Sequence, residues 1–196
     1  MSEVSTGSPG ALCGATLVRA ARESDMGAAR DIYAHYVLHS LATFEEVPPT
    51  LDDMLMRRRA SVDLGLPYLV AEEGGRVLGF AYAGPFRARA AYRYTLEDSV
   101  YVAPEAAGRG VGRAVLSAVI AACEALGVRQ LMAVIGDSGN AASIGLHRSL
   151  GFEQTGVGRS VGFKHGRWVD IVHMQKALNG GDSLAPGGPG ITLNGH

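Results

Sequence analysis

The sequence predicts an α/β fold, a mixed sheet with helices on both of its faces. Four segments show the helical recurrence of apolar residues and seven short segments resemble strands, in the order β-α-α-β-β-β-α-β-α-β-β. That order combines hairpins with helical crossovers, which makes the sheet mixed. The chain has 196 residues, 47% of them hydrophobic and 19% charged, so one domain with a sizeable core is expected.

The first third of the chain supplies one strand and two helices. Thr16–Ala20 is a short strand. Ser24 is the predicted N-cap of the first helix, whose apolar face comprises Met26, Ala29, Ile32, Tyr33 and Tyr36. Thr50 is the predicted cap of a second helix, which runs through Met54 and Leu55.

A hairpin, a strand and a third helix follow. Tyr68–Glu72 and Arg76–Ala83 form the hairpin around a Gly74-Gly75 turn. Tyr94–Val102 is the next strand. The third helix is stopped by Gly127, and its apolar face comprises Val111, Val115, Ala118, Val119, Ala122 and Leu126.

The last third completes the sheet. Leu131–Ile135 is a short apolar strand, and Ala141–Leu150 is a helix closed by Gly151. Phe152–Gly158 and Val169–Met174 are the last two strands. The sequence therefore predicts seven strands and four helices.

Composition excludes several classes of function. The net charge of −1 and the pI of about 6.6 give no basic surface for nucleic acid. Cys13 and Cys123 show neither disulfide nor zinc spacing, and no histidine pattern indicates a metal site. No signal peptide or membrane span is evident, so we expect a cytoplasmic protein with a folded body over 16–178. Residues 1–15 and the Gly/Pro-rich stretch 179–196 are expected to be flexible.

One glycine-rich loop stands between a strand and a helix. Residues 98–113 read DSVYVAPEAAGRGVGR, with Gly108, Gly110 and Gly112 at every second position. The spacing fits neither a dinucleotide-binding fingerprint nor a P-loop. It could be a simple tight turn. Alternatively, side-chain-free residues and the N–H groups of the following helix could bind a pyrophosphate, helped by Arg109 and Arg113.

The loop resembles the acetyl-CoA loop of the GNAT N-acetyltransferase superfamily, whose pattern is Q/R-x-x-G-x-G/A. Here the pattern falls on AGRGVG, and Ala107 replaces the usual Gln or Arg, which leaves only the backbone cradle at that position. NAASIGLHRSLGF, residues 140–152, resembles a later motif of the family. ATFEEVPPT, YAGPFRARAAYRYTLEDSVYV and GFKHGRWVDIVHMQ resemble the phosphinothricin and methionine sulfoximine acetyltransferases.

The resemblance implies a GNAT fold with a splay between the fourth and fifth strands, and acetyl-CoA as cosubstrate without a metal. The fold would place the pantetheine arm against the backbone of Val100, Tyr101 and Val102, with a hydrogen bond from Asn140. The pyrophosphate would lie on the loop formed by Ala107, Gly108, Arg109, Gly110, Val111, Gly112 and Arg113.

Two residues are catalytic candidates. Glu97 lies inside a strand, on the face of Ser99 and Tyr101, and the family assigns the matching Glu as the base, acting directly or through water. The alternatives are a solvated charge or an ion pair with Arg93, and Asp98 is a weaker candidate. His147 occupies the position of the family's thiolate-protonating Tyr, and imidazole can do the same work. The alternative is a surface histidine near a helix end.

The acceptor side rests on three segments. Arg87 and Arg89 follow a Gly-Pro turn and could bind an acidic group bidentately, or could be solvated surface arginines. In resembling enzymes such loops close the substrate pocket, sometimes across a homodimer interface. The other residues expected at this side are Thr43, Phe44, Tyr92, Phe163, Lys164 and His165.

The predicted function is therefore acetyl transfer from acetyl-CoA to the amino group of a small amino-acid-like acceptor. Phosphinothricin, methionine sulfoximine and methionine sulfone are the acceptors implied by resemblance, and the outcome would be detoxification. Two alternatives remain open. The acceptor could be a protein N-terminus or a polyamine, although a polyamine would favour carboxylates where Arg87 and Arg89 stand. The chain could also be a non-catalytic sensor of acyl-CoA. Cys123, inside a helix without an adjacent base, is expected to be a packed small residue.

Overall fold

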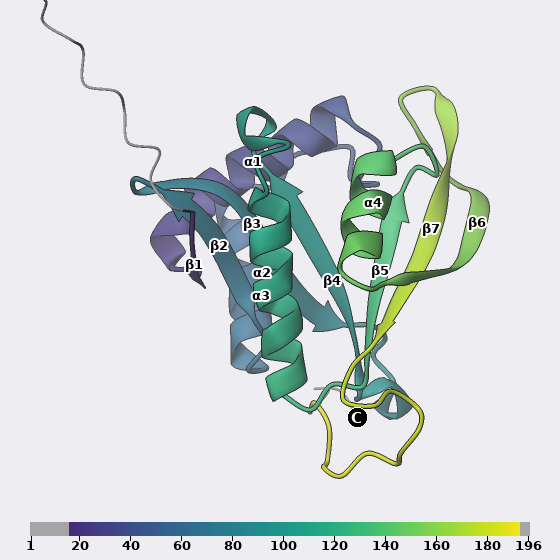
Figure 1. Cartoon of the computed structure of the whole chain (residues 1–196). Coiled ribbons are helices and arrows are strands. Elements are labelled where there is room, and N and C mark those ends of the chain that lie inside the picture. Colours follow the sequence, from purple (N-terminus) through teal and green to yellow (C-terminus); the bar gives the residue numbers. More distant parts are fainter. Residues whose placement is uncertain (1–15, 193–196) are drawn as a thin grey trace, which may run out of the picture.

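A computed structural model describes residues 16–192. One seven-stranded sheet in the order β1-β2-β3-β4-β5-β7-β6 forms the centre. α3 and α4 cover one face of the sheet, and α1 and α2 cover the other (Figure 1). The strands are β1 (Leu17–Ala20), β2 (Tyr68–Glu73), β3 (Arg76–Pro85), β4 (Thr95–Val102), β5 (Gln130–Gly136), β6 (Glu153–Lys164) and β7 (Arg167–Ala177). The α-helices are α1 (Met26–His39), α2 (Leu51–Asp63), α3 (Val111–Ala125) and α4 (Ala141–Ser149).

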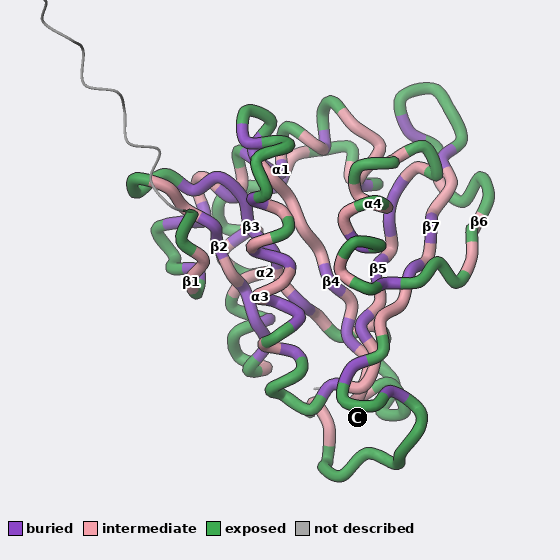
Figure 2. Tube along the Cα trace, viewed as in Figure 1, coloured by how far each residue is buried: buried purple, intermediate pink, exposed green. Residues whose placement is uncertain are grey.

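The order of elements and the mixed sheet are confirmed. All neighbouring strands are antiparallel except β4 and β5, which are joined through α3 and run parallel. Buried stretches follow the central strands and the sheet-facing side of α3 (Figure 2). β6 and β7 are longer than expected because their pairing continues to the turn at His165 and Gly166.

Two details of the sequence prediction are wrong. Ser24 is not the N-cap of α1, because it lies inside a 3-10 turn, Glu23–Asp25, that precedes the helix. The carboxylate of Asp25 accepts the Arg22 backbone N–H at 2.6 Å and pairs with Arg19, which stabilises that turn. Leu126 is 41% exposed, since it follows the last turn of α3 and no longer faces the sheet. Thr50 does cap α2, where it accepts the Asp53 backbone N–H at 3.1 Å.

β4 and β5 separate along their length, as expected for the splay. Their pairing extends only from Thr95 opposite Gln130 to Asp98 opposite Ala133. Beyond Asp98, β4 continues to Val102 paired with β3 alone, while β5 continues to Gly136 paired with β7. The far ends of the two strands therefore leave backbone groups facing the gap between them.

Residues 40–46, between α1 and α2, pack closely against β5 and β6, which come from the second half of the chain. A Cβ on Gly136 would lie 2.3 Å from the Leu41 carbonyl oxygen, and a Cβ on Gly162 would lie 2.0 Å from the Phe44 ring. Both glycines therefore allow close approach of this segment to β5 and β6. The Lys164 ammonium adds a bond of 2.8 Å to the Thr43 carbonyl oxygen.

The C-terminal stretch from 179 to 192 packs back against the start of β4. The backbone N–H of Ile191 donates to the Arg93 carbonyl at 2.8 Å, and the Tyr94 hydroxyl donates to the Gly188 carbonyl at 2.6 Å. Arg129 donates to the Gly181 carbonyl at 2.8 Å. This end of the sheet lies away from the gap between β4 and β5 (Figure 1).

Candidate active site

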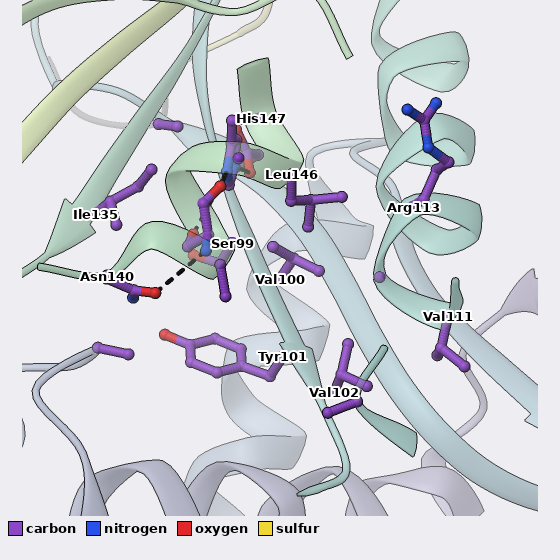
Figure 3. Close-up of a pocket in the computed structure, with 18 of the residues that line it drawn as sticks. Ser99, Val100, Tyr101, Val102, Val111, Arg113, Ile135, Asn140, Leu146 and His147 are labelled. Carbon is purple, nitrogen blue, oxygen red and sulfur yellow. Dashed lines mark hydrogen bonds and ion pairs between the residues drawn. The ribbon is translucent and has the colours of Figure 1, made fainter. Parts of the chain in front are cut away.

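A cavity of about 500 Å³ opens where β4 and β5 separate. Its walls come from β4, β5, the glycine loop, the start of α3 and one side of α4. In Figure 3 the labelled residues of β4 lie between Asn140 and Ile135 on one side and Val111 and Arg113 on the other. Most residues expected to bind the cofactor line this cavity: Val100, Tyr101, Val102, Ala107, Gly108, Gly110, Val111, Gly112, Arg113 and Asn140.

The glycine loop presents backbone rather than side chains to the cavity. Gly108 and Gly110 have φ of 75° and 83°, which glycine adopts without strain. Gly110 is the N-cap of α3 and provides no side-chain cap, so the first N–H groups of the helix are free to bind an anion. A Cβ on Gly112 would lie 3.3 Å from both Leu146 and Val102, so this glycine keeps the space between α3 and α4 open.

Arg113 and Arg109 have different environments. Arg113 lines the cavity and donates to the Ser149 carbonyl at 3.3 Å. The guanidinium of Arg109 forms an ion pair with Glu73 of the β2–β3 hairpin and does not line the cavity. Of the two arginines expected at the pyrophosphate, the structure thus places only Arg113 at the cavity wall.

Asn140 lies at the cavity wall but its side chain is already bonded. Its carbonyl oxygen accepts the Ser143 backbone N–H at 3.2 Å and so caps α4, and its amide donates to the Gly136 carbonyl at 3.4 Å. One N–H of the amide and one lone pair of its oxygen stay available, so the expected bond from Asn140 to a pantetheine arm can form beside these contacts.

Tyr36 is a site residue that the sequence did not indicate. It lies on α1, lines the cavity, and donates its hydroxyl to the Val102 carbonyl at 2.7 Å. In the sequence it was one more apolar position of the first helix. No local pattern distinguishes a tyrosine that faces a gap in the sheet from one that fills the core.

His147 is buried and bonded to Asp98. The residue is 2% exposed, which excludes the alternative of a surface histidine. Its Nε2 lies 3.0 Å from Asp98 Oδ2, and its Nδ1 lies 2.8 Å from the Ser143 carbonyl oxygen. Burial alone would lower the pKa of His147, but the bonds to Asp98 and Ser143 raise it above its ordinary value.

Glu97 faces the opposite side of β4 from Asp98. It is half-buried, and burial raises the pKa of its carboxyl although the nearby Arg87 opposes this shift. The ion pair with Arg93 considered from the sequence is not formed, because Arg93 donates to the Ala90 carbonyl at 2.9 Å and lies over the Tyr94 ring. A carboxylate with a raised pKa is suited to take a proton near neutral pH.

The residues expected on the acceptor side form two groups. Thr43, Phe44 and Lys164 meet where residues 40–46 pack on β6. Arg87, Arg89 and Tyr92 line a separate exposed hollow of about 370 Å³. Phe163 and His165 join neither group: Phe163 is 57% exposed and contacts Trp168, and His165 forms the β6–β7 turn.

The Thr43 group is tied to α1 and α2 by a polar network. The Tyr33 hydroxyl lies 2.8 Å from the Thr43 hydroxyl and 2.9 Å from Glu45, which also pairs with Arg57. The network lies beside Tyr101 of β4, whose ring centroid is 4.8 Å from that of Tyr33. The side of β4 that carries Glu97 therefore faces hydroxyl and charged groups.

Other chemistries find little support in the described part of the chain. No cluster of three His, Cys, Asp or Glu side chains that could hold a metal occurs within 16–192. Cys123 is fully buried in α3, and burial raises the pKa of its thiol to about 12, which fits the expectation of a packed small residue. No helix within these residues is long and apolar enough to cross a membrane.

The backbone cradle, the open cavity and the parting strands together define an acyl-CoA site on a GNAT-type sheet. The chain belongs to the Acetyltransferase (GNAT) family, whose profile matches residues 30–152, and it is an acetyl-CoA-dependent N-acetyltransferase. The loop geometry fits the cosubstrate, because the free N–H groups at the start of α3 can bind a pyrophosphate.

Particular relatives are similar over most of the chain. The phosphinothricin N-acetyltransferase of Alcaligenes faecalis is 57% identical over 90% of this chain and 89% of its own length. The L-methionine sulfoximine/L-methionine sulfone acetyltransferase of Salmonella typhimurium is 43% identical over 83% of this chain and 94% of its own. The crystal structure of a phosphinothricin acetyltransferase from Sinorhizobium meliloti in complex with acetyl-CoA superposes with a TM-score of 0.84, at 45% identity and 87% and 92% coverage.

Proposed function

We propose that this chain transfers the acetyl group of acetyl-CoA to the amino group of a small amino-acid-like compound. Phosphinothricin, methionine sulfoximine and methionine sulfone are the acceptors that the similar enzymes act on by name. The observation that carries the proposal is the position of β4. One of its sides lines the acetyl-CoA cavity and the other presents Glu97 to a polar region.

Glu97 acts as the base. An amino group is mostly protonated at neutral pH, and only the neutral form attacks a thioester. The raised pKa of Glu97 places its basicity closer to neutrality, so it accepts the amine proton directly or through water. Attack then takes place in a ternary complex, without an acetylated enzyme, since Cys123 is buried and burial raises the pKa of its thiol to about 12.

The remaining steps use the backbone and His147. A backbone N–H of β4 beyond Glu97 stabilises the oxyanion of the tetrahedral intermediate, since pairing with β5 ends at Asp98. His147 then donates a proton to the leaving thiolate. Its raised pKa supports this role, because the ring stays protonated above its usual range.

On the acceptor side, Arg87 and Arg89 bind the acidic group of the substrate. Both arginines line the same hollow, and the charge of Arg87 acts on Glu97. An amino acid held by its acidic group at these arginines would bring its amino group toward the base. A polyamine, with no acidic group, would be repelled by the same charges.

A panel of amines tests the proposal. Release of CoA thiol is measured with phosphinothricin, methionine sulfoximine, methionine sulfone, a polyamine and an alanine-terminated peptide as acceptors. The expected result is fast release with the first three compounds alone. Equal or faster release with the peptide or polyamine would change the acceptor class. Tight CoA binding without thiol release for any amine would favour the non-catalytic sensor.

We also propose a homodimer. Phe163 and Trp168 are 57% and 65% exposed and lie 5.4 Å apart between ring centroids on the β6–β7 hairpin. Exposed neighbouring aromatic residues are typical of protein interfaces. Light scattering on the purified protein should give twice the mass of 20.5 kDa, and the mass of one chain would contradict the proposal. The cytoplasmic location expected from the sequence stays a prediction.

A further inference from the structure

The contact between Asp98 and His147 lies at the inner end of the cavity. Asp98 is the last residue of β4 that pairs with β5, and His147 faces it from α4. The Nδ1 of His147 lies 2.8 Å from the Ser143 carbonyl oxygen, which can only accept a hydrogen bond. Nδ1 therefore carries a proton, and Nε2, which faces Asp98, is the ring nitrogen at which a proton can be exchanged.

We propose that Asp98 is a positioning residue for acetyl transfer, because its carboxylate orients the His147 ring and keeps a proton on Nε2. The inference rests on the proposed function, in which His147 protonates the thiolate. In that step the amine nitrogen bonds to the acetyl carbon and Glu97 accepts the amine proton. The carbon–sulfur bond breaks with its electron pair on sulfur, and the proton that His147 Nε2 shares with Asp98 leaves this hydrogen bond and moves to sulfur. The neutral ring regains its proton from solvent after the products leave.

The groups described around the pair are an aromatic ring, a neutral thiol and an exposed arginine. The negative charge beside the imidazole therefore comes from Asp98. The side chains of His147 and Asp98 are 3% and 1% exposed. From β6's side, the Phe152 ring meets the imidazole edge-on at 5.0 Å between centroids. From α3, Cys123 feels the charge of Asp98 but stays a neutral thiol. Arg148, next along α4, is exposed.

Asp98 has a second feature that packing does not explain. Its Oδ1 is buried and has no hydrogen-bond partner among residues 16–192, although the residue lines the cavity. Such unpaired buried oxygens are costly and tend to occur at functional sites. Burial also raises the pKa of Asp98, even though the bond from His147 opposes the shift. Since the pKa of both partners is raised, the pair holds its proton to a higher pH than the two side chains would separately.

Asp98→Asn tests the proposal with little change of shape. The new amide can donate to Nε2, so the ring becomes neutral and holds its one proton on Nδ1, toward Ser143. We expect kcat to fall by about 10- to 100-fold, while KM for acetyl-CoA stays within about twofold. Asp98→Ser removes the same charge and should give the same loss. The exposed Asp63→Asn, at the end of α2, is the control and should leave kcat unchanged.

Two further measurements separate positioning from a structural role. NMR of protein labelled with 15N-histidine gives the pKa of His147, identified by its absence in His147→Gln, and this pKa should fall in Asp98→Asn. In the His147→Gln background, adding Asp98→Asn should change kcat less than about twofold, because Asp98 acts through the ring. Equal losses in both backgrounds, or an unchanged pKa of His147, would overturn the proposal. The NMR titration needs no acetyl transfer, so its result stands even if the proposed function fails.

Discussion

The two sides of β4 are built in different ways. On the side of α3 and α4, the cavity is shaped by backbone: glycines, a helix N-terminus and strand ends released from pairing. On the side of Glu97, side chains on loops dominate, with Arg87 and Arg89 in one exposed hollow and Thr43 in a buried network. The backbone side suits a cosubstrate shared by many enzymes, whereas the side-chain side can vary with the acceptor.

The comparison makes a general point about specificity. We call the α3 and α4 side of β4 the cofactor half. Backbone N–H groups can bind a pyrophosphate whatever the neighbouring side chains, so we expect the cofactor half to tolerate Ala107 where the family has Gln or Arg. Arginines recognise an acidic group by their charge and planar fork, so exchange of one residue changes the preferred acceptor. The two halves should therefore respond to different mutations with different kinetic constants.

Glu97→Gln should give the largest effect. Glu97 lies in the acceptor half, by which we mean the side of β4 opposite the cofactor half. Loss of the base should lower kcat by about 100- to 1000-fold and leave KM for acetyl-CoA unchanged. Thiol release at saturating substrates measures the effect, with the exposed Glu153→Gln as a matched control. A variant with the wild-type rate and pH profile would remove Glu97 from the mechanism.

Gly112→Leu should damage the cofactor half alone. A Cβ added at this position would lie 3.3 Å from both Leu146 and Val102, so a leucine would fill the space between α3 and α4. Overpacking of about 1–3 kcal/mol against the bound cosubstrate corresponds to a rise of about 10- to 100-fold in KM for acetyl-CoA. KM for the acceptor should not change.

Ala121→Leu is the control for this substitution, since it adds the same side chain on the exposed face of the same helix. Calorimetric titration with CoA should show the loss of affinity directly. If Gly112→Leu raised KM for the acceptor as much as KM for acetyl-CoA, the two sides of β4 would not be independent.

Arg87→Met should affect the acceptor half more mildly. Loss of one charge-assisted hydrogen bond at an exposed site should raise KM for the acceptor by about 10-fold, with KM for acetyl-CoA unchanged. Arg159→Met, at a side chain that is 81% exposed on β6, is the control. An unchanged acceptor KM in both Arg87→Met and Arg89→Met would leave these residues as solvated surface arginines.

Much of the cofactor half could be predicted from the sequence because its determinants are local. A strand, three alternating glycines and an apolar helix are contiguous, so ten of the eleven residues expected to bind the cofactor line the cavity. Arg109 is the exception, because its partner Glu73 comes from a distant hairpin. Local patterns cannot reveal an ion pair of that kind.

The acceptor half was harder to predict from the sequence, because its side chains come from segments that are far apart along the chain. Lys164 and Thr43 are 121 residues apart, and the two glycines that allow the close approach of residues 40–46 are also distant from that segment in the sequence. The pairing of Asp98 with His147 was also not foreseen, since strand alternation indicated only that Asp98 and Glu97 face opposite ways. Such contacts depend on tertiary packing.

Lys164→Met should have the smallest effect, and it tests how the acceptor half is held together. Lys164 is 2% exposed, and burial lowers the pKa of its ammonium although Glu46 and Glu45 oppose the shift. Between this lowered pKa and the ordinary value of 10.5, the unfolded chain binds more protons than the folded one. Stability of the wild type therefore rises with pH in that window, because the cost of the buried charge disappears.

The methionine variant lacks this titration and keeps a similar side-chain volume. We expect the Tm of the wild type minus the Tm of Lys164→Met to increase as the pH rises toward 10.5, by no more than about 4 °C. Thermal unfolding followed by circular dichroism across this range measures the difference. Lys176→Met of β7 is unsuitable as a control, because Lys176 is half-buried and its ammonium lies against Gly151. Arg159→Met serves instead, since its side chain is exposed on β6. A Tm difference that stays constant with pH would mean that the ammonium of Lys164 is solvated, and that residues 40–46 are held by Gly136, Gly162 and the Tyr33 network alone.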